Sequence, residues 1–125
     1  RLTEEDGGEG KFQGGKGIIM DYRVRSKNAW LSVAYTRSKS LPWSLEGGRE
    51  GGPNYVEIIR KDGKKERYSV ITVLPLEPED VVRIHTGNGG GYGNPHDRDI
   101  KLIENDLLNE YITLEQASKY YNYKK

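Results

Sequence analysis

The chain has 125 residues, and its 20 basic and 19 acidic side chains leave a formal charge of +1. A field this weak attracts neither nucleic acid nor anionic lipid, so we expect no nucleic acid and no membrane among its partners. The absence of cysteine excludes disulfides, a thiolate nucleophile and a zinc-thiolate site. No apolar run approaches the ~20 residues of a membrane span, and the first residues do not resemble a signal peptide, so a cytoplasmic location is the expectation.

Glycine is the clearest deviation in the composition, with 16 residues where a share of about 7% is usual. All of them lie between Gly7 and Gly93, and the mean hydropathy of -0.85 indicates a thin hydrophobic core. We therefore predict an α+β fold with a mainly antiparallel β body, glycine-rich turns and two C-terminal helices. One structural domain would comprise a glycine-rich N-terminal arm (1–17), a β-rich body (18–95) and a helical tail (96–125).

The start of the chain changes from irregular to alternating. Residues 1–17 are too polar and too rich in glycine to bury a face of their own, which predicts a loop or docking arm. A half-buried strand follows, whose apolar face is predicted to hold Ile18, Met20, Tyr22 and Val24. The alternation resumes over residues 31–35, and this short spacing predicts an antiparallel hairpin between the two strands.

The rest of the body holds one long loop and three shorter strands. Residues 37–54 show no periodicity, and a loop of this length is usually functional or packed against another element. Strands predicted over 55–60 and 67–73 flank Asp62-Gly63, whose tolerance of positive φ suits a hairpin turn. A further strand over 81–86 leads into a second glycine cluster.

The tail has the pattern of two helices. The first is predicted to begin at Asp97 or Asp99 as N-cap and to bury Ile100, Ile103, Leu107, Leu108 and Tyr111. The second is predicted to begin at Thr113, because Thr113 and Gln116 form a capping-box pair. Its predicted buried face consists of Leu114, Ala117 and Tyr121.

Two glycine clusters are candidates for anion binding. Gly10–Gly17 comes within one residue of the phosphate-binding pattern G-x-x-x-x-G-K-[ST], but Gly17 removes the hydroxyl that reaches magnesium, and no helix is predicted to follow. The second cluster misses the dinucleotide fingerprint at Tyr92, which favours a close-approach turn over an anion cradle. Its candidate residues are Gly87, Gly89, Gly90, Gly91 and Gly93.

Catalytic and metal chemistry have little support in the sequence. His85 and His96 are its two histidines, and the nearby Asp97 and Asp99 are explained as residues at a helix start, so no metal site is predicted. Ser44 has no local base, and no catalytic residue is identified.

Subunit docking is better supported. The residues 37–54 carry apolar side chains that a loop cannot bury by itself, which makes Leu41, Trp43 and Leu45 candidates for docking. A cluster of aromatics near the end of the chain adds further interface candidates, namely Tyr120, Tyr121 and Tyr123.

Four stretches, taken in order, resemble the C-terminal portion of the hydantoinase B/oxoprolinase family, whose relatives include the large subunits of acetone- and acetophenone-type carboxylases. These stretches are Gly7–Gly17, Leu41–Gly48, Asp80–Ile84 running into Gly89–Pro95, and Tyr111–Ala117. The match spans nearly the whole chain, with departures from the family pattern at Ser44, Glu79 and Asn94. Family members run to several hundred residues, so the chain corresponds to about their last quarter.

The resemblance implies the C-terminal domain or small subunit of an ATP-dependent hydrolase that opens a cyclic amide such as a hydantoin or 5-oxoproline. It implies an A-type subunit that activates the substrate with ATP and a B-type subunit that completes the reaction, with ATP and a divalent metal in the whole complex. In the carboxylase relatives, the metal lies in an earlier part of the large subunit to which this chain does not correspond. This chain would bind no cofactor, show no activity alone, and complete the B-type fold and its contacts. Two alternatives stay open: the equivalent piece of an ATP-dependent ketone carboxylase, or a free-standing β-rich module that binds a ligand through Trp43 and the glycine loop.

Overall fold

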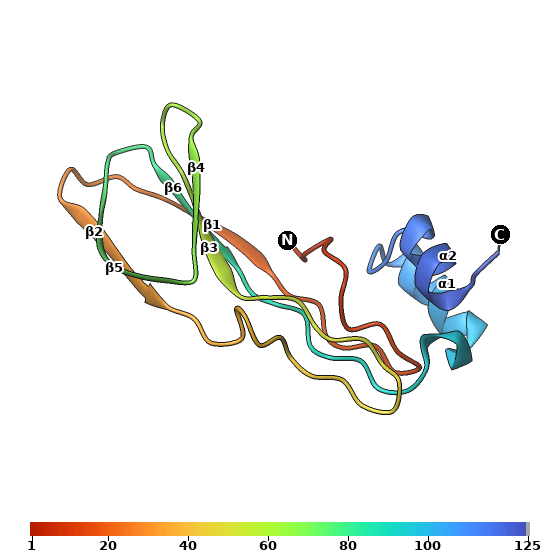
Figure 1. Ribbon diagram of the computed structural model, residues 1–125. Coiled ribbons are helices and arrows are strands. Elements are labelled where there is room, and N and C mark those ends of the chain that lie inside the picture. The colour runs from red at the N-terminus through yellow and green to blue at the C-terminus, as the bar shows by residue number, and fades with distance from the viewer. Residues whose placement is uncertain (125) are drawn as a thin grey trace.

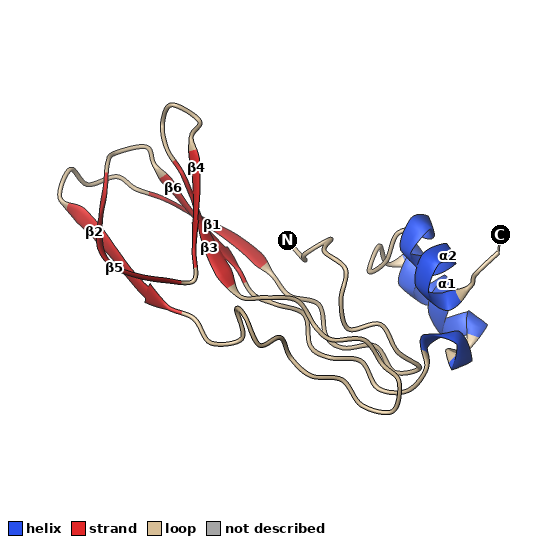
Figure 2. Ribbon diagram, in the orientation of Figure 1, coloured by secondary structure: helices blue, strands red, loops and turns tan. Residues whose placement is uncertain are grey.

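The computed structural model describes residues 1–124 and has strands at one end and helices at the other (Figure 1). Long extended loops run side by side between the two ends (Figure 2). The strands are β1 (Ile19–Arg23), β2 (Ala29–Ala34), β3 (Tyr55–Ile59), β4 (Lys65–Tyr68), β5 (Val70–Leu76) and β6 (Val81–His85). A 3₁₀ helix η1 (Pro95–Asp97) precedes α1 (Ile100–Leu108) and α2 (Leu114–Tyr121). The predicted α+β class is confirmed. No helix within residues 1–124 has the length and apolar character to cross a membrane.

One of the two predicted hairpins is wrong and the other is present. The expected hairpin between residues 18–24 and 31–35 is wrong, because β1 pairs with β6 and β2 pairs with β5. Alternation identifies a strand but does not select its partner. The hairpin around Asp62-Gly63 is present as β3 and β4, although the predicted strand 67–73 is divided after Tyr68. From Val70 the chain belongs to the second sheet, so β5 covers the first sheet and does not extend it.

The two sheets enclose a core of side chains. The sheet β1-β6-β3-β4 and the pair β2-β5 bury one cluster between them, formed by Val56, Ile58, Leu76 and Val82. Met20 and Tyr22, predicted to be buried, are 38% and 55% exposed, because the packed cluster covers β3 and β6 but does not reach the edge strand β1. Met20 and Tyr22 therefore remain partly exposed at the open edge of the first sheet.

The two helices begin where the sequence predicted. Asp99 caps α1 by accepting a hydrogen bond from the amide of Lys101, and the capping box of Thr113 and Gln116 opens α2. The predicted buried faces are only partly correct, because two short helices bury one narrow stripe. Exposed residues that were predicted to be buried are Ile100, Leu108, Tyr111 and Leu114.

The helical core also corrects the expected tyrosine interface. Tyr120 and Tyr121 lie in this chain's own cluster, together with Ile103, Ile112 and Ala117. Tyr123 is half-buried and packs against the same cluster. Tyr120 and Tyr121 are therefore not available as docking residues.

Candidate functional site

Between the sheets and the helices, three extended segments pack backbone against backbone. We call residues 7–17, 41–53 and 86–93 the glycine stack; its segments run together in Figure 2. A Cβ atom added at Gly90 would lie 1.9 Å from the carbonyl oxygen of Trp43, and one added at Gly14 would lie 2.1 Å from that of Gly89. Separations this short exclude any side chain, as at the crowded axis of a collagen triple helix. The segment 86–93 is thus enclosed by the other two.

Four of the five candidate glycines in the second cluster already use their amides in hydrogen bonds within this chain. Hydrogen bonds run from the amides of Gly87, Gly89, Gly91 and Gly93 to acceptors on Asn54, Gly15, Arg49 and Leu45, respectively. Because these donors are satisfied, the cluster has little left to offer an anion. Only Gly93 within 87–93 has a positive φ, at 75°, so close approach and not turn conformation requires glycine at Gly90.

The N-terminal arm is a structural part of the stack. Its Gly14 amide donates to the carbonyl of Gly8, and its Gly17 amide donates to the side chain of Asn88. A strand, β1, follows the segment where a phosphate-binding loop would need a helix. The arm's glycines therefore contact this chain's own backbone, and no helix N-terminus follows the near-match to a phosphate loop.

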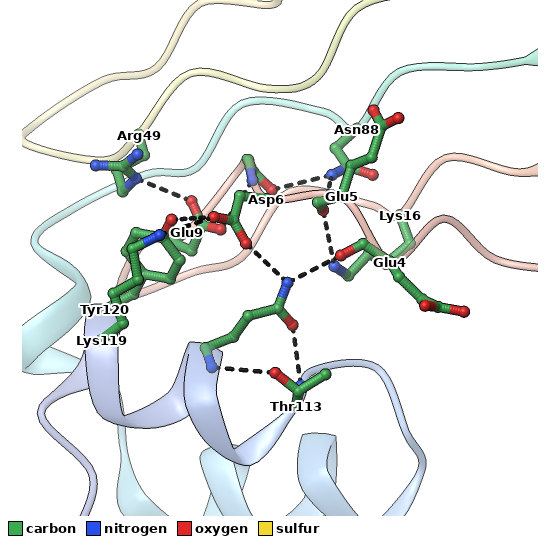
Figure 3. A network of polar contacts seen from close by, with 12 residues as sticks. Glu4, Glu5, Asp6, Glu9, Lys16, Arg49, Asn88, Thr113, Lys119 and Tyr120 are labelled. Carbon is green, nitrogen blue, oxygen red and sulfur yellow. Dashed lines mark hydrogen bonds and ion pairs between the residues drawn. The ribbon is translucent and has the colours of Figure 1, made fainter.

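Buried polar side chains hold the arm in place. Asn88 is 1% exposed, accepts a hydrogen bond from the Gly17 amide at 2.8 Å and donates to the carbonyls of Glu5 and Gly7 (Figure 3). Glu9 is also buried and accepts from the Gly7 amide at 2.8 Å and from Arg49 Nε at 3.1 Å. The two side chains fasten the arm to the other two segments of the stack.

A third contact joins the arm to helix α2. The Asp6 carboxylate accepts hydrogen bonds from Tyr120 Oη, Gln116 Nε2 and Lys119 Nζ (Figure 3). Burial by itself would raise the pKa of Asp6, but these three donors together outweigh it and lower the pKa to about 2. Asp6 is therefore an ionised clamp between the arm and the helical end.

An exposed apolar row crosses the outside of the stack. Phe12 and Tyr92 exchange backbone hydrogen bonds as an antiparallel pair, with ring centroids 6.2 Å apart, and Leu45 pairs with Tyr92 from the other side. All three side chains are about half exposed, and nearby Trp43 is 62% exposed. We call Phe12, Trp43, Leu45 and Tyr92 the apolar row. Among the predicted docking residues, Trp43 and Leu45 belong to it, whereas Leu41 is half-buried.

The two histidines have unrelated surroundings. His85 stacks on Tyr55 with ring centroids 4.1 Å apart, and the Tyr55 hydroxyl donates to Glu5 at 2.5 Å. Burial lowers the pKa of His85, which favours the neutral imidazole. His96 is exposed in η1. No group of three or more His, Cys, Asp or Glu side chains that could hold a metal ion occurs within residues 1–124, so these residues by themselves supply no full ligand set for the metal that the sequence resemblance implies for the whole assembly.

The comparisons with known proteins agree with the sequence motifs. The family model for hydantoinase B/oxoprolinase matches residues 1–95. An uncharacterised protein of Methanocaldococcus jannaschii is 42% identical over 123 residues, which cover 98% of this chain and 22% of that protein. The caprolactamase subunit beta of Pseudomonas jessenii is 29% identical over 93% of this chain and 21% of its own length.

Solved structures share the fold. The crystal structure of ATP-dependent caprolactamase from Pseudomonas jessenii matches 97% of this chain with a TM-score of 0.81 and 28% identity, over 22% of that chain. An acetone carboxylase structure matches the same share of this chain with a TM-score of 0.77, over 20% of its own length. Its 17% identity makes it a likeness of fold alone. The chain thus spans about a fifth of the length of these proteins.

Proposed function

The chain belongs to the hydantoinase B/oxoprolinase family, as its motifs predicted, and we propose that it is the C-terminal domain or small subunit of an ATP-dependent cyclic-amide hydrolase. Its role in that enzyme is structural: it completes the B-type fold and provides contacts for assembly. The observation that carries the proposal is the match of nearly the whole chain, in sequence and in fold, to part of the caprolactamase. That relative is described as a subunit and as ATP-dependent, which supports an ATP-using partner subunit here.

ATP and a divalent metal would bind to other parts of the assembly. The stack amides that resemble a phosphate loop donate to this chain's own acceptors. Among the residues that the structure describes, no cluster of metal ligands is present. We expect the isolated chain to hydrolyse neither hydantoin nor 5-oxoproline in the presence of ATP and magnesium. A cytoplasmic location remains part of this proposal.

The apolar row is the proposed surface for docking to the remainder of the B-type polypeptide. Docking through the glycines of the arm, which the sequence suggested, does not suit this structure because those glycines, with the exception of the exposed Gly15, are covered by the stack. The row instead holds aromatic side chains in the open, and aromatics commonly anchor interfaces. Its position outside the stack leaves it free without any change in the fold.

The test is a titration of this chain against the co-expressed larger B-type fragment. Trp43→Ala should weaken association by on the order of 2 kcal/mol, or roughly 30-fold in Kd. Trp30→Ala is the matched control, because Trp30 on β2 is equally exposed at 62% but lies on the sheets. The free energy of unfolding of each variant should lie within about 0.5 kcal/mol of the parent's, since neither side chain is buried. Equal affinities for the two variants would contradict docking through the row.

The ketone carboxylase alternative has weaker support. The acetone carboxylase shares the fold at 17% identity, whereas the caprolactamase is 28% identical with a higher TM-score. The assembled enzyme separates the two functions: ATP-dependent opening of a lactam, hydantoin or 5-oxoproline supports the hydrolase, and carboxylation of a ketone supports the alternative. A free-standing module would bind its ligand with no larger fragment present.

A further inference from the structure

The four-stranded sheet β1-β6-β3-β4 has one edge, β1, along which a further strand could pair. Its β4 edge carries Lys65, Glu66 and Arg67, and such charged side chains discourage pairing with a further strand. The β1 edge is different, because an antiparallel ladder already starts along it. Leu2 bridges to Ile18, the Arg1 amino group donates to the Ile19 carbonyl at 3.1 Å, and the Ile19 amide donates to the Arg1 carbonyl at 2.8 Å.

This ladder pairs Arg1–Thr3 with residues 17–19 and does not extend along the rest of β1. In antiparallel pairing, the N–H and C=O groups of successive residues point alternately to the two sides of a strand. The Ile18 carbonyl and the Val24 amide form hydrogen bonds with β6 or its flanks, so the backbone groups of the even-numbered residues point toward β6. The backbone groups of Ile19 point to the other side, toward Arg1. The backbone groups of Asp21 and Arg23 therefore also point outward. Among residues 1–124, nothing pairs with them.

The side chains of β1 indicate which residue types an added strand would carry on each of its faces. Met20 and Tyr22 lie on the face that packs against β2 and β5, and both are exposed at the open edge. On the opposite face, Asp21 is paired with Arg83 at 2.7 Å and Arg23 with Glu79 at 3.0 Å. A matching strand would place apolar side chains beside Met20 and Tyr22, and polar ones on the opposite face.

We propose that an extended segment of the remaining B-type polypeptide adds to β1 as an antiparallel strand, in the register that Arg1–Thr3 begin. The inference rests on the proposed function and deepens it by naming a docking surface. This chain spans about a fifth of its relatives, so most of their polypeptide lies outside it and is the source of the segment. The added backbone would exchange hydrogen bonds with Asp21 and Arg23, and its apolar residues would cover Met20 and Tyr22.

Amide hydrogen exchange, measured with and without the larger B-type fragment, tests this pairing residue by residue. The amides of Asp21 and Arg23 should exchange quickly in the free chain and at least about tenfold more slowly in the complex. The backbone amides of Met20 and Tyr22 point toward β6, so they are internal controls and should be protected in both states. If association saturates while Asp21 and Arg23 stay unprotected, the strand inference fails and the proposed function stands. If the fragments never associate, both fail.

A second copy of the chain is the competing occupant. Protection of Asp21 and Arg23 that appears in the chain alone, together with dimerisation, would assign the edge to a second copy and overturn the proposal. Pairing of β1 with β1 would also be expected to disappear on dilution, whereas protection by the larger fragment follows that fragment's concentration.

A matched pair of variants tests the same hydrogen bonds through affinity. Arg23→Pro removes both the side chain and the outward N–H, whereas Arg23→Ala removes the side chain alone. Proline is tolerated on an edge strand where its nitrogen faces solvent, so the two free variants should melt alike. We expect Arg23→Pro to bind the larger fragment about fivefold more weakly than Arg23→Ala. Equal affinities would overturn the pairing at Arg23.

Discussion

The two sheets and the glycine stack bury their residues in opposite ways. Between the sheets, side chains such as Val56 and Ile58 are fully buried and fill the interior. In the stack, the contacts are between backbones, and the buried side chains are the polar Asn88 and Glu9. The first region is stabilised by apolar burial, whereas the second depends on satisfied backbone hydrogen bonds and close approach. Removing a methyl group should therefore harm the sheets, and adding one should harm the stack.

The largest effect is expected when a methyl group is added inside the stack. In Gly90→Ala the new Cβ would lie 1.9 Å from the Trp43 carbonyl oxygen, so whole backbone segments must move. We expect a loss of about 3 kcal/mol or more in the free energy of unfolding. The matched control is Gly15→Ala, where no atom lies within 4 Å of the added Cβ and the loss should stay below about 1 kcal/mol. Chemical denaturation of both variants measures the difference. Similar losses would mean that the stack does not depend on close approach.

Removing a methyl group from the sheet core should have a smaller effect. Ile58→Val deletes one methyl group from a fully buried side chain, and the expected loss is about 1 kcal/mol. Val70→Ala is the control, because Val70 on β5 is 66% exposed and should change stability by less than about 0.5 kcal/mol. A loss at Ile58 that exceeds the loss at Gly90 would reverse the comparison between the two regions.

The sequence predicted best what depends on neighbours along the chain. The capping box joins Thr113 and Gln116, which are three positions apart, and both helix starts could be located from such local patterns. Strand partners could not, because the choice between β6 and β2 as the neighbour of β1 depends on contacts far apart in sequence. The exposed face of Met20 and Tyr22 was missed for the same reason.

The stack shows the same limit at the level of single residues. Asn88 stands among glycines with no local pattern, and its hydrogen-bond partners Gly17 and Glu5 lie 71 and 83 positions away. The lack of periodicity in residues 37–54 predicts Trp43 as a docking residue, whereas no pattern in the sequence assigns Phe12 or Tyr92 to a surface. One signal was available: each is a lone aromatic between glycines, where a stack that admits no side chain inward must turn the ring outward.

The smallest predicted effect concerns the contact between arm and helix α2. The pKa of Asp6 is lowered from 3.8 in the unfolded chain to about 2 in the folded protein. A depressed carboxylate pKa contributes stability that is fully present above the unfolded value and is lost as the pH falls through the folded value. The Asp6 clamp should therefore act above about pH 4 and weaken between about pH 4 and pH 2.

Asp6→Asn measures this contribution directly. Because the Asp6 side chain is 42% exposed, solvent screens its ion pair with Lys119, and we expect the variant to lose at most about 1 kcal/mol near neutral pH. The difference from the parent should shrink as the pH falls from about 4 toward 2, since the parent carboxylate is then protonated as well. Asp97→Asn, in the exposed η1, is the charge-matched control and should differ little from the parent across this range. Urea titrations of all three proteins at several pH values test the sign, and a difference that grows on acidification would contradict the clamp.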